Sequence, residues 1–116
     1  LAVGPGLGTE GTSASLLSTA LERNIPLLLD AGHLAFAGGD VLRAIDNHHA
    51  RINHVHVKDI RRSVVDGLDR SRQSFLDAVA LGAFTVPGDG SLDFGAIVQR
   101  LAQGVQHKVV IHIGAA

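Results

Sequence analysis

The chain has 116 residues, 46% of them hydrophobic, and a formal net charge of −1, which suits one compact domain and is too small for two. Acidic and basic residues are close to balanced in both halves, so charge gives no case for binding nucleic acid or a membrane. The sequence lacks cysteine and any apolar run of about 20 residues, which excludes disulfides, zinc-thiolate sites and thiol nucleophiles and favours a cytoplasmic protein.

The first quarter of the chain is predicted to be a strand, a glycine-rich turn and a helix. Residues 1–3 are apolar and precede the glycine-rich stretch 4–11. A helix is expected over residues 12–23, because its apolar residues repeat at helical spacing. The sequence begins at Leu1, inside the apparent strand, and we therefore expect a piece of a longer protein or a recombined chain.

The second predicted strand is the apolar run Leu27–Leu29, which leads to Asp30. It does not alternate with polar residues, as is typical of a parallel strand covered on both faces. Asp40 is expected to cap a helix, and Ile52–Val57 is expected to form the next strand. The expected buried face of that helix includes Val41, Leu42 and Ile45.

The second half of the chain continues the alternation of strands and helices. We expect a polar loop from residue 60 to 71, whose arginines are solvated, and a helix from Ser74 to Leu81. A turn is predicted over 86–90, and Ser91 is expected to cap a further helix. The last strand is predicted over residues 108–113. The residues expected to face inward from the last helix are Phe94, Ile97, Val98 and Leu101.

These elements predict an α/β fold with four parallel strands joined by helical crossovers. Such a unit is either half of a TIM barrel, which takes about 250 residues in full, or a small flavodoxin-like open sheet. Half a barrel has two exposed strand edges, and exposed edges favour pairing with another chain. We therefore expect a homo-oligomer.

The glycine-rich turn contains the pattern G-x-G-x-x-G from Gly6 to Gly11, and Asp30 follows 19 residues later. This spacing is typical of a dinucleotide-binding loop, in which glycines admit the phosphates and the acid binds the ribose. Glu10, however, would place a negative charge beside the phosphate, and a structural tight turn is the alternative. The candidate phosphate-binding glycines are Gly4, Gly6, Gly8 and Gly11.

The sequence of this segment resembles the ribokinase-like NAD(P)H-hydrate dehydratases. The resemblance lies in Leu1-Ala2-Val3-Gly4-Pro5-Gly6-Leu7-Gly8 followed by Ile25-Pro26-Leu27-Leu28-Leu29-Asp30-Ala31. Those are ADP- or ATP-dependent repair enzymes. The resemblance covers about a quarter of the chain and includes no catalytic residue of that family.

A second resemblance covers residues 27–101. Four blocks in order, at 29–40, 51–59, 74–79 and 84–90, resemble myo-inosose dehydratase, one of the xylose-isomerase-like barrels related to sugar epimerases and endonuclease IV. The resemblance implies that Asp30 and His56 bind a divalent metal, and a carboxylate with an imidazole suits Mn, Co or Fe. It also implies that His33 and Lys58 face a polyol or inosose substrate.

The residue types agree with that chemistry. Removing water next to a ketone requires loss of an acidified proton and departure of hydroxide, and a divalent ion lowers both barriers. His54, His56 and Lys58 share one side of their strand, because alternate residues of a strand point the same way. Each histidine could instead be a hydrogen-bonded structural residue, and His48 and His49 a solvated helix end.

The ligand set is incomplete by comparison with the resembled family, whose site takes four ligands from four strands. The expected glutamates are absent from the strand before Asp30 and from the last strand, where His112 is a candidate substitute. Asp59 and Asp89 are candidates for turn or cap residues.

Three interpretations of function follow. The first is a recombined fragment of a metal-dependent hydro-lyase of inositol metabolism, joined near Asp30 between segments 1–30 and 31–116, with weak or lost activity. The second is a folded domain that self-associates without catalysis. The third is a nucleotide-phosphate-binding module that uses the glycine loop.

Overall fold

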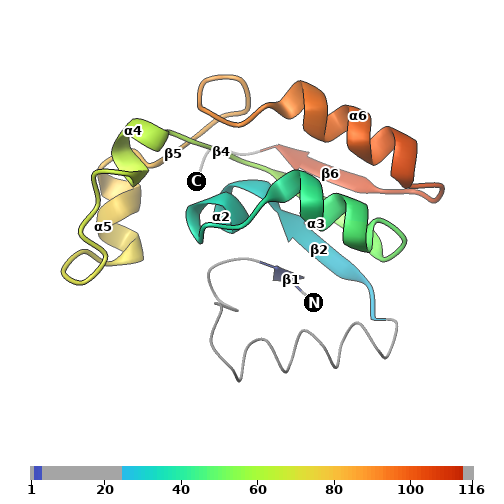
Figure 1. The fold of residues 1–116 in the computed structure, drawn as a ribbon, viewed down its shortest axis with the longest axis horizontal. Helices are drawn as coiled ribbons and strands as arrows, with labels where there is room; N and C mark the ends of the chain where they lie inside the picture. Colours follow the sequence, from blue (N-terminus) through green and yellow to red (C-terminus); the bar gives the residue numbers. More distant parts are fainter. Residues whose placement is uncertain (1, 4–24, 114–116) are drawn as a thin grey trace.

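Four parallel strands form the central sheet in the order β1-β2-β3-β6 (Figure 1). The computed structural model describes residues 2–3 and 25–113. The strands are β1 (Ala2–Val3), β2 (Leu27–Asp30), β3 (Ile52–Val57) and β6 (Val110–Ile113). The prediction of a four-stranded parallel α/β unit is confirmed. Each strand pairs with the next strand of this sheet along the chain, as in a barrel, whereas a doubly wound sheet reverses its order at a switch point.

The two faces of the sheet differ in composition. Cross-strand partners share a face. We term one face the open face, and it is defined by the two rows of partners given at the end of this paragraph. The opposite face carries Leu29 and Val55, which are fully buried in the apolar core. The rows of the open face are Leu28–His54–Val110 and Asp30–His56–His112.

Three helices pack on the apolar side of the sheet, where α3 and α6 contact each other (Figure 1). They are α2 (Ala31–Phe36), α3 (Val41–His48) and α6 (Phe94–Gly104). Asp40 caps α3 as predicted, and Ile45, Ile97 and Leu101 join the strand residues in one core. The Cα positions extend over 38 × 33 × 18 Å, a thickness that suits one sheet and one helix layer. None of the helices within 25–113 is long and apolar enough to cross a membrane.

Between β3 and α6 the chain makes an excursion to one end of the sheet (Figure 1). It consists of β4 (Asp59–Ile60), α4 (Arg62–Val65), α5 (Phe75–Ala80) and β5 (Phe84–Thr85), and β4 pairs with β5 in the antiparallel sense. Ser74 caps α5 through a capping box with Asp77. The predicted loop over 60–71 is therefore wrong in part, because it contains the end of β4 and all of α4.

The excursion is anchored by the fully buried carboxylate of Asp59. Its two oxygens accept hydrogen bonds of 2.8 to 3.1 Å from four backbone N–H groups, those of Ile60, Gly88, Gly90 and Leu92. A Cβ on Gly90 would lie 2.5 Å from this carboxylate, so only glycine fits there. The carboxylate thus holds the predicted turn over 86–90 against β4.

Several local predictions are wrong. The six-residue helix α2 is not predicted, because Gly32 interrupts its apolar pattern. Asp93, and not Ser91, caps α6, since the Asp93 side chain accepts the Ala96 N–H while Ser91 accepts the Arg62 N–H. Val98 is 52% exposed and does not face inward.

Two of the arginines expected to be solvated hold parts of the fold together. The Arg61 guanidinium donates to the carbonyl of Gly82 at 2.8 Å and to the carboxylate of Asp89 at 2.9 Å. Arg70 donates to the carbonyl of Phe36 at 2.6 Å and lies 4.2 Å from that ring's centroid. Long polar side chains thus link segments that lie far apart in the sequence.

Candidate functional site

Asp30 occupies the junction between the sheet and the helix layer. It is the last residue of β2 and the N-cap of α2, and its Oδ1 accepts the backbone N–H of His33 at 3.0 Å. Gly32 permits this junction, because a Cβ there would lie 2.6 Å from the Lys58 carbonyl oxygen. The cap fixes the carboxylate and leaves its second oxygen, Oδ2, available to other groups.

Three nitrogen groups surround Asp30 Oδ2. The Nδ1 atoms of His33 and His56 lie 3.3 Å away, and Lys58 Nζ lies 4.0 Å away. Asp30 and His56 are cross-strand partners, and Lys58 directly follows β3. The structure therefore brings together all four residues predicted for metal binding and catalysis, while their roles stay predictions.

His33 and Lys58 form a second contact within this group. Lys58 Nζ lies 3.3 Å from His33 Nε2, and the Lys58 side chain is only 11% exposed. A Lys58 ammonium donates to Nε2 of His33 in the tautomer whose proton is on Nδ1. Burial lowers the pKa of His33 below its ordinary value of 6.5, against the opposing effect of Asp30, and Lys58 and His56 lower it further. Burial thus favours the neutral form of the His33 imidazole.

Phenylalanine rings pack around His33. Its ring meets those of Phe75 and Phe84 edge-on, at centroid distances of 5.3 and 5.2 Å, and Phe36 contacts both. Lys58 Nζ lies 5.6 Å from the centroid of the Phe84 ring. Sequence reasoning missed this wall, although a signal existed, since the chain has only four phenylalanines and no tyrosine or tryptophan. The wall limits water at His33, which agrees with its lowered pKa.

A row of imidazoles continues across the open face from the site. The His112 ring lies 5.4 Å from that of His56 and 5.7 Å from that of His54, nearly parallel to the latter. The prediction that His54 and His56 point to one side is confirmed by these contacts. His112, the candidate substitute ligand, thus lies beside His56, one strand further from Asp30.

Asp30 and His56 fit part of a metal coordination shell. Two ligand atoms about 2.1 Å from one ion at tetrahedral angles are roughly 3.4 Å apart, close to the 3.3 Å between Asp30 Oδ2 and His56 Nδ1. A hydrogen bond explains the same distance. Within the parts of the chain that the structure describes, no group of three or more His, Asp or Glu side chains is placed to hold a metal ion. These residues therefore supply at most a pair of ligands.

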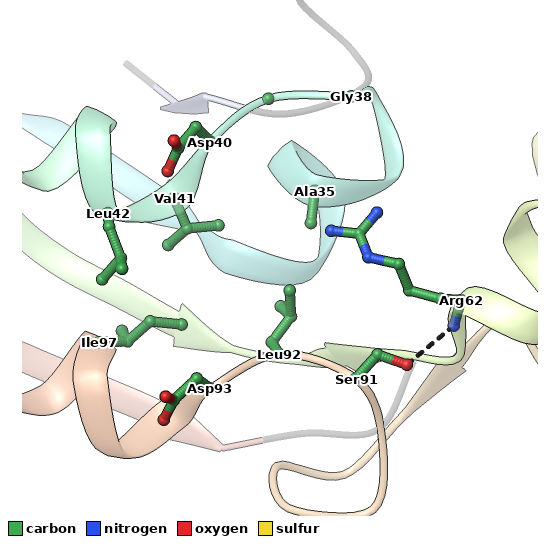
Figure 2. Close-up of a pocket in the computed structure, with 11 residues that line it drawn as sticks. Ala35, Gly38, Asp40, Val41, Leu42, Arg62, Ser91, Leu92, Asp93 and Ile97 are labelled. Carbon is green, nitrogen blue, oxygen red and sulfur yellow. Dashed lines mark hydrogen bonds between the residues drawn. The ribbon is translucent and has the colours of Figure 1, made fainter.

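The predicted phosphate-binding loop and a cavity are two further candidate regions. The glycines predicted to bind phosphate, Gly4 to Gly11, are outside the described residues. A cavity of about 350 Å³ lies between the starts of α3 and α6 (Figure 2), where Asp40 and Asp93 already cap their helices and the Arg62 side chain reaches across. None of the four site residues lines this cavity.

The chain is similar to inosose dehydratases. It is 40% identical to the inosose dehydratase of Geobacillus thermodenitrificans (strain NG80-2) over 99 residues, 85% of this chain and 33% of that protein. It is 43% identical to the inosose dehydratase of Clostridium tetani (strain Massachusetts / E88) over 87% of this chain and 34% of that protein. It is 48% identical to the rhizopine catabolism protein MocC of Rhizobium meliloti over 76% of this chain and 27% of that protein. The chain spans about a third of the length of these curated relatives, and no family model matches it.

Proposed function

We propose that this chain carries part of the catalytic site of a metal-dependent hydro-lyase that dehydrates an inosose or a related polyol ketone. The observation that carries the proposal is the convergence of His33, His56 and Lys58 on one oxygen of Asp30. Its setting agrees with the chemistry, because active sites of parallel α/β barrels lie at the carboxyl ends of strands. The similarity to proteins named inosose dehydratase supports the substrate class.

The proposed reaction removes a proton from the carbon next to a ketone and a hydroxide from the following carbon. His33, neutral because burial lowers its pKa, serves as the base that accepts the proton. Lys58, held 3.3 Å from His33, provides a cation for the oxygen on which negative charge develops or a proton for the departing hydroxide. Asp30 keeps the His33 ring in the tautomer this requires.

Asp30 and His56 are the proposed metal ligands. A carboxylate and an imidazole suit Mn, Co or Fe in the divalent state, and no cysteine is needed. When bound, such an ion would polarise the substrate oxygens and so ease both bond cleavages. Because the described residues supply only this pair of ligands, we propose that turnover by a single copy of the chain is weak.

The recombined origin of the chain stays a prediction. It rests on the resemblance of residues 1–31 to the glycine-loop segment of the NAD(P)H-hydrate dehydratases, and residues 4–24 lie outside the described ranges. The similarity to the Geobacillus enzyme covers 99 residues, more than the stretch 27–101 that carried the predicted resemblance. Part of the glycine-loop segment or of the C-terminal end is therefore shared with the dehydratases as well.

The test is inosose turnover with added Mn²⁺ or Co²⁺, followed by NMR of substrate and product. The chain has two lysines, which provide a matched pair of variants: Lys58→Met removes the site ammonium, and Lys108→Met removes an exposed one. We expect a loss of at least about 100-fold for Lys58→Met and none for Lys108→Met. Equal rates in the two variants, or no turnover by the unaltered chain at any metal concentration, would contradict the proposed function.

A further inference from the structure

We propose that Asp59 is a positioning residue for Lys58. Its buried carboxylate is bound to the turn over residues 86–90 and thereby fixes the direction in which the neighbouring ammonium enters the site. The way in which Lys58 is held is argued from contacts among the described residues. What its position does for the reaction rests on the proposed function.

The Asp59 carboxylate is held from two sides. It is fully buried, and its oxygens accept four backbone N–H groups at 2.8 to 3.1 Å. One donor is the next residue, Ile60, and the other three, those of Gly88, Gly90 and Leu92, lie 29 to 33 residues further along the chain. A rotation of this side chain would leave several buried N–H groups without an acceptor, which is costly. The turn therefore sets the direction of the Asp59 side chain.

The backbone on both sides of Asp59 is fixed as well. The carbonyl of Ile60 accepts the N–H of Ser91 at 2.8 Å, and β4 pairs with β5. On the other side, the Lys58 carbonyl packs so closely on Gly32 that a Cβ there would lie 2.6 Å from its oxygen. The backbone of Lys58 is thus enclosed between the start of α2 and the anchored strand β4.

The direction of Lys58 follows from that of Asp59. Neighbouring residues of an extended segment point to opposite sides, and the Asp59 side chain points to the turn over 86–90. Lys58 is thereby directed to the other side, where its Nζ lies 3.3 Å from His33 Nε2 and 4.0 Å from Asp30 Oδ2. A change of backbone angle that released Asp59 would also turn Lys58 away from the site.

The contacts of the ammonium itself are too long to fix it. Hydrogen bonds between a charged nitrogen donor and a carboxylate are typically about 2.7 to 2.9 Å long, whereas Lys58 Nζ lies 4.0 Å from the Asp30 oxygen. A lysine side chain is also flexible, with many rotamers of similar energy. The order of Lys58 must therefore come in part from its backbone, which Asp59 holds.

The position of Lys58 matters for the proposed reaction because its ammonium acts where charge develops. A displacement of about 1 Å at such a group can lower the rate about 100-fold. An interaction made only in the transition state changes kcat and leaves KM nearly unchanged. Asp59 touches neither substrate nor metal in this scheme, so its effect on turnover must pass through Lys58.

The first experiment measures how well Lys58 is held, without any catalysis. The chain has two lysines, so the acetylation rate of Lys58 can be divided by that of the exposed Lys108 in the same sample, by mass spectrometry of the folded chain. We expect Lys58 to react at least about tenfold more slowly than Lys108, because its side chain is only 11% exposed. Asp59→Asn should raise the ratio of the two rates at least about fivefold, because two buried donors lose their acceptor.

The matched control is Arg61→Met, which loosens the same excursion and leaves Asp59 unaltered. The Arg61 guanidinium donates to the Gly82 carbonyl at 2.8 Å, the Thr85 hydroxyl at 3.0 Å and the Asp89 carboxylate at 2.9 Å. If Asp59 only stabilised the excursion, both variants would release Lys58. We expect the ratio in Arg61→Met to change by less than about twofold.

Gly90→Ala is a second test that keeps the carboxylate and its charge. A Cβ there would lie 2.5 Å from Asp59 Cγ and must displace it, so the acetylation ratio should rise in this variant too. It decides the question if Asp59→Asn does not fold. The proposal is overturned by a ratio in the folded Asp59 or Gly90 variant that equals that of the unaltered chain, or that equals that of Arg61→Met.

The second experiment measures inosose turnover with Mn²⁺. Asp59→Asn should lower kcat about 10- to 100-fold and change KM by less than about threefold. In a chain that already carries Lys58→Met, Asp59→Asn should lower kcat no further, because the group through which it acts has been removed. Losses that multiply in the double variant would show that Asp59 acts independently of Lys58 and would overturn the proposal.

The two experiments also separate this inference from the proposed function. A chain in which Asp59→Asn releases Lys58 to acetylation, but which turns over no inosose at any concentration of Mn²⁺, retains the positioning and overturns the function. A chain that turns over inosose, and in which Lys58 stays protected after Asp59→Asn, does the reverse.

Discussion

The substitution Asp59→Asn is expected to lower the free energy of unfolding by about 3 kcal/mol. The carboxylate is fully buried, and each of its oxygens accepts two backbone N–H groups. An amide has one oxygen and one NH₂ group, so two of the four N–H donors would face another donor.

The magnitude follows from the bonds that are lost. A hydrogen bond to a charged acceptor contributes roughly 1.5 to 3 kcal/mol, which gives about 3 to 6 kcal/mol for the two lost bonds. The loop that follows β5 is partly exposed, and water can reach the freed donors, so we expect the lower end of that range. A domain of this size has a total stability of about 5 to 15 kcal/mol, and a loss of 3 kcal/mol is readily measured.

The assay is urea denaturation followed by far-ultraviolet circular dichroism, since the chain has no tryptophan or tyrosine for fluorescence. Asp93→Asn is the matched control, because Asp93 caps α6 with one exposed hydrogen bond and asparagine caps helices as well as aspartate. We expect the control to change stability by less than about 0.5 kcal/mol. A loss for Asp59→Asn no larger than that of the control would refute the anchoring role of the carboxylate.

Three further predictions concern packing and pH. Gly90→Ala should lower the free energy of unfolding by more than about 2 kcal/mol, because its Cβ would lie 2.5 Å from a buried carboxylate oxygen. Gly88→Ala, at a φ of +92° with open space around it, should lower it by about 1 kcal/mol. Equal losses of stability in urea denaturation would contradict the steric reason. Arg70→Ala should cost about 1 to 2 kcal/mol, since it removes a 2.6 Å hydrogen bond and a ring contact, and thermal denaturation at unchanged Tm would contradict this. Burial, aided by Arg51, lowers the pKa of His48 in the folded chain below 6.5. The unfolded chain therefore binds a proton at His48 more readily than the folded chain does. The associated stability is present above pH 6.5 and is lost as the pH falls through the lower pKa of the folded state. His48→Gln should therefore reduce the loss of stability between about pH 7.5 and about pH 5, and an unchanged pH dependence would exclude the contribution.

The central sheet could be predicted from local sequence because its strands carry strong local signals. The run Leu27–Leu29 has no polar alternation, which is typical of a buried parallel strand. Ile52–Val57 is bounded by polar residues, which also favours a strand. Parallel strands end at one edge of a sheet, so Asp30, His56 and Lys58 could be expected to meet before any coordinates were known. Their convergence is observed.

The excursion after β3 could not be predicted in the same way, because its order depends on contacts across 20 to 35 residues. Lys58 and Asp59 are consecutive and both carry charge, yet one reaches the site and the other is the buried anchor of the following loop. Neighbouring residues of an extended segment point to opposite sides, but the sequence alone does not say which side is buried. The phenylalanine wall depends on the same long-range packing, since Phe36, Phe75 and Phe84 come from three separate elements.

The geometry around Asp30 is a consequence of the fold. Oδ1 is committed to the N-terminus of α2, and that bond aims Oδ2 at the imidazoles whether or not an ion or a substrate is ever bound. A chain that had lost its remaining ligands would keep this arrangement as long as β2 and α2 stayed folded. The decisive quantity is therefore the number of donors that can reach one ion, and within the described residues Asp30 and His56 supply two of them. Binding of Mn²⁺ and turnover of inosose must therefore be measured together, because binding without turnover would show that the two ligands are retained without a working site.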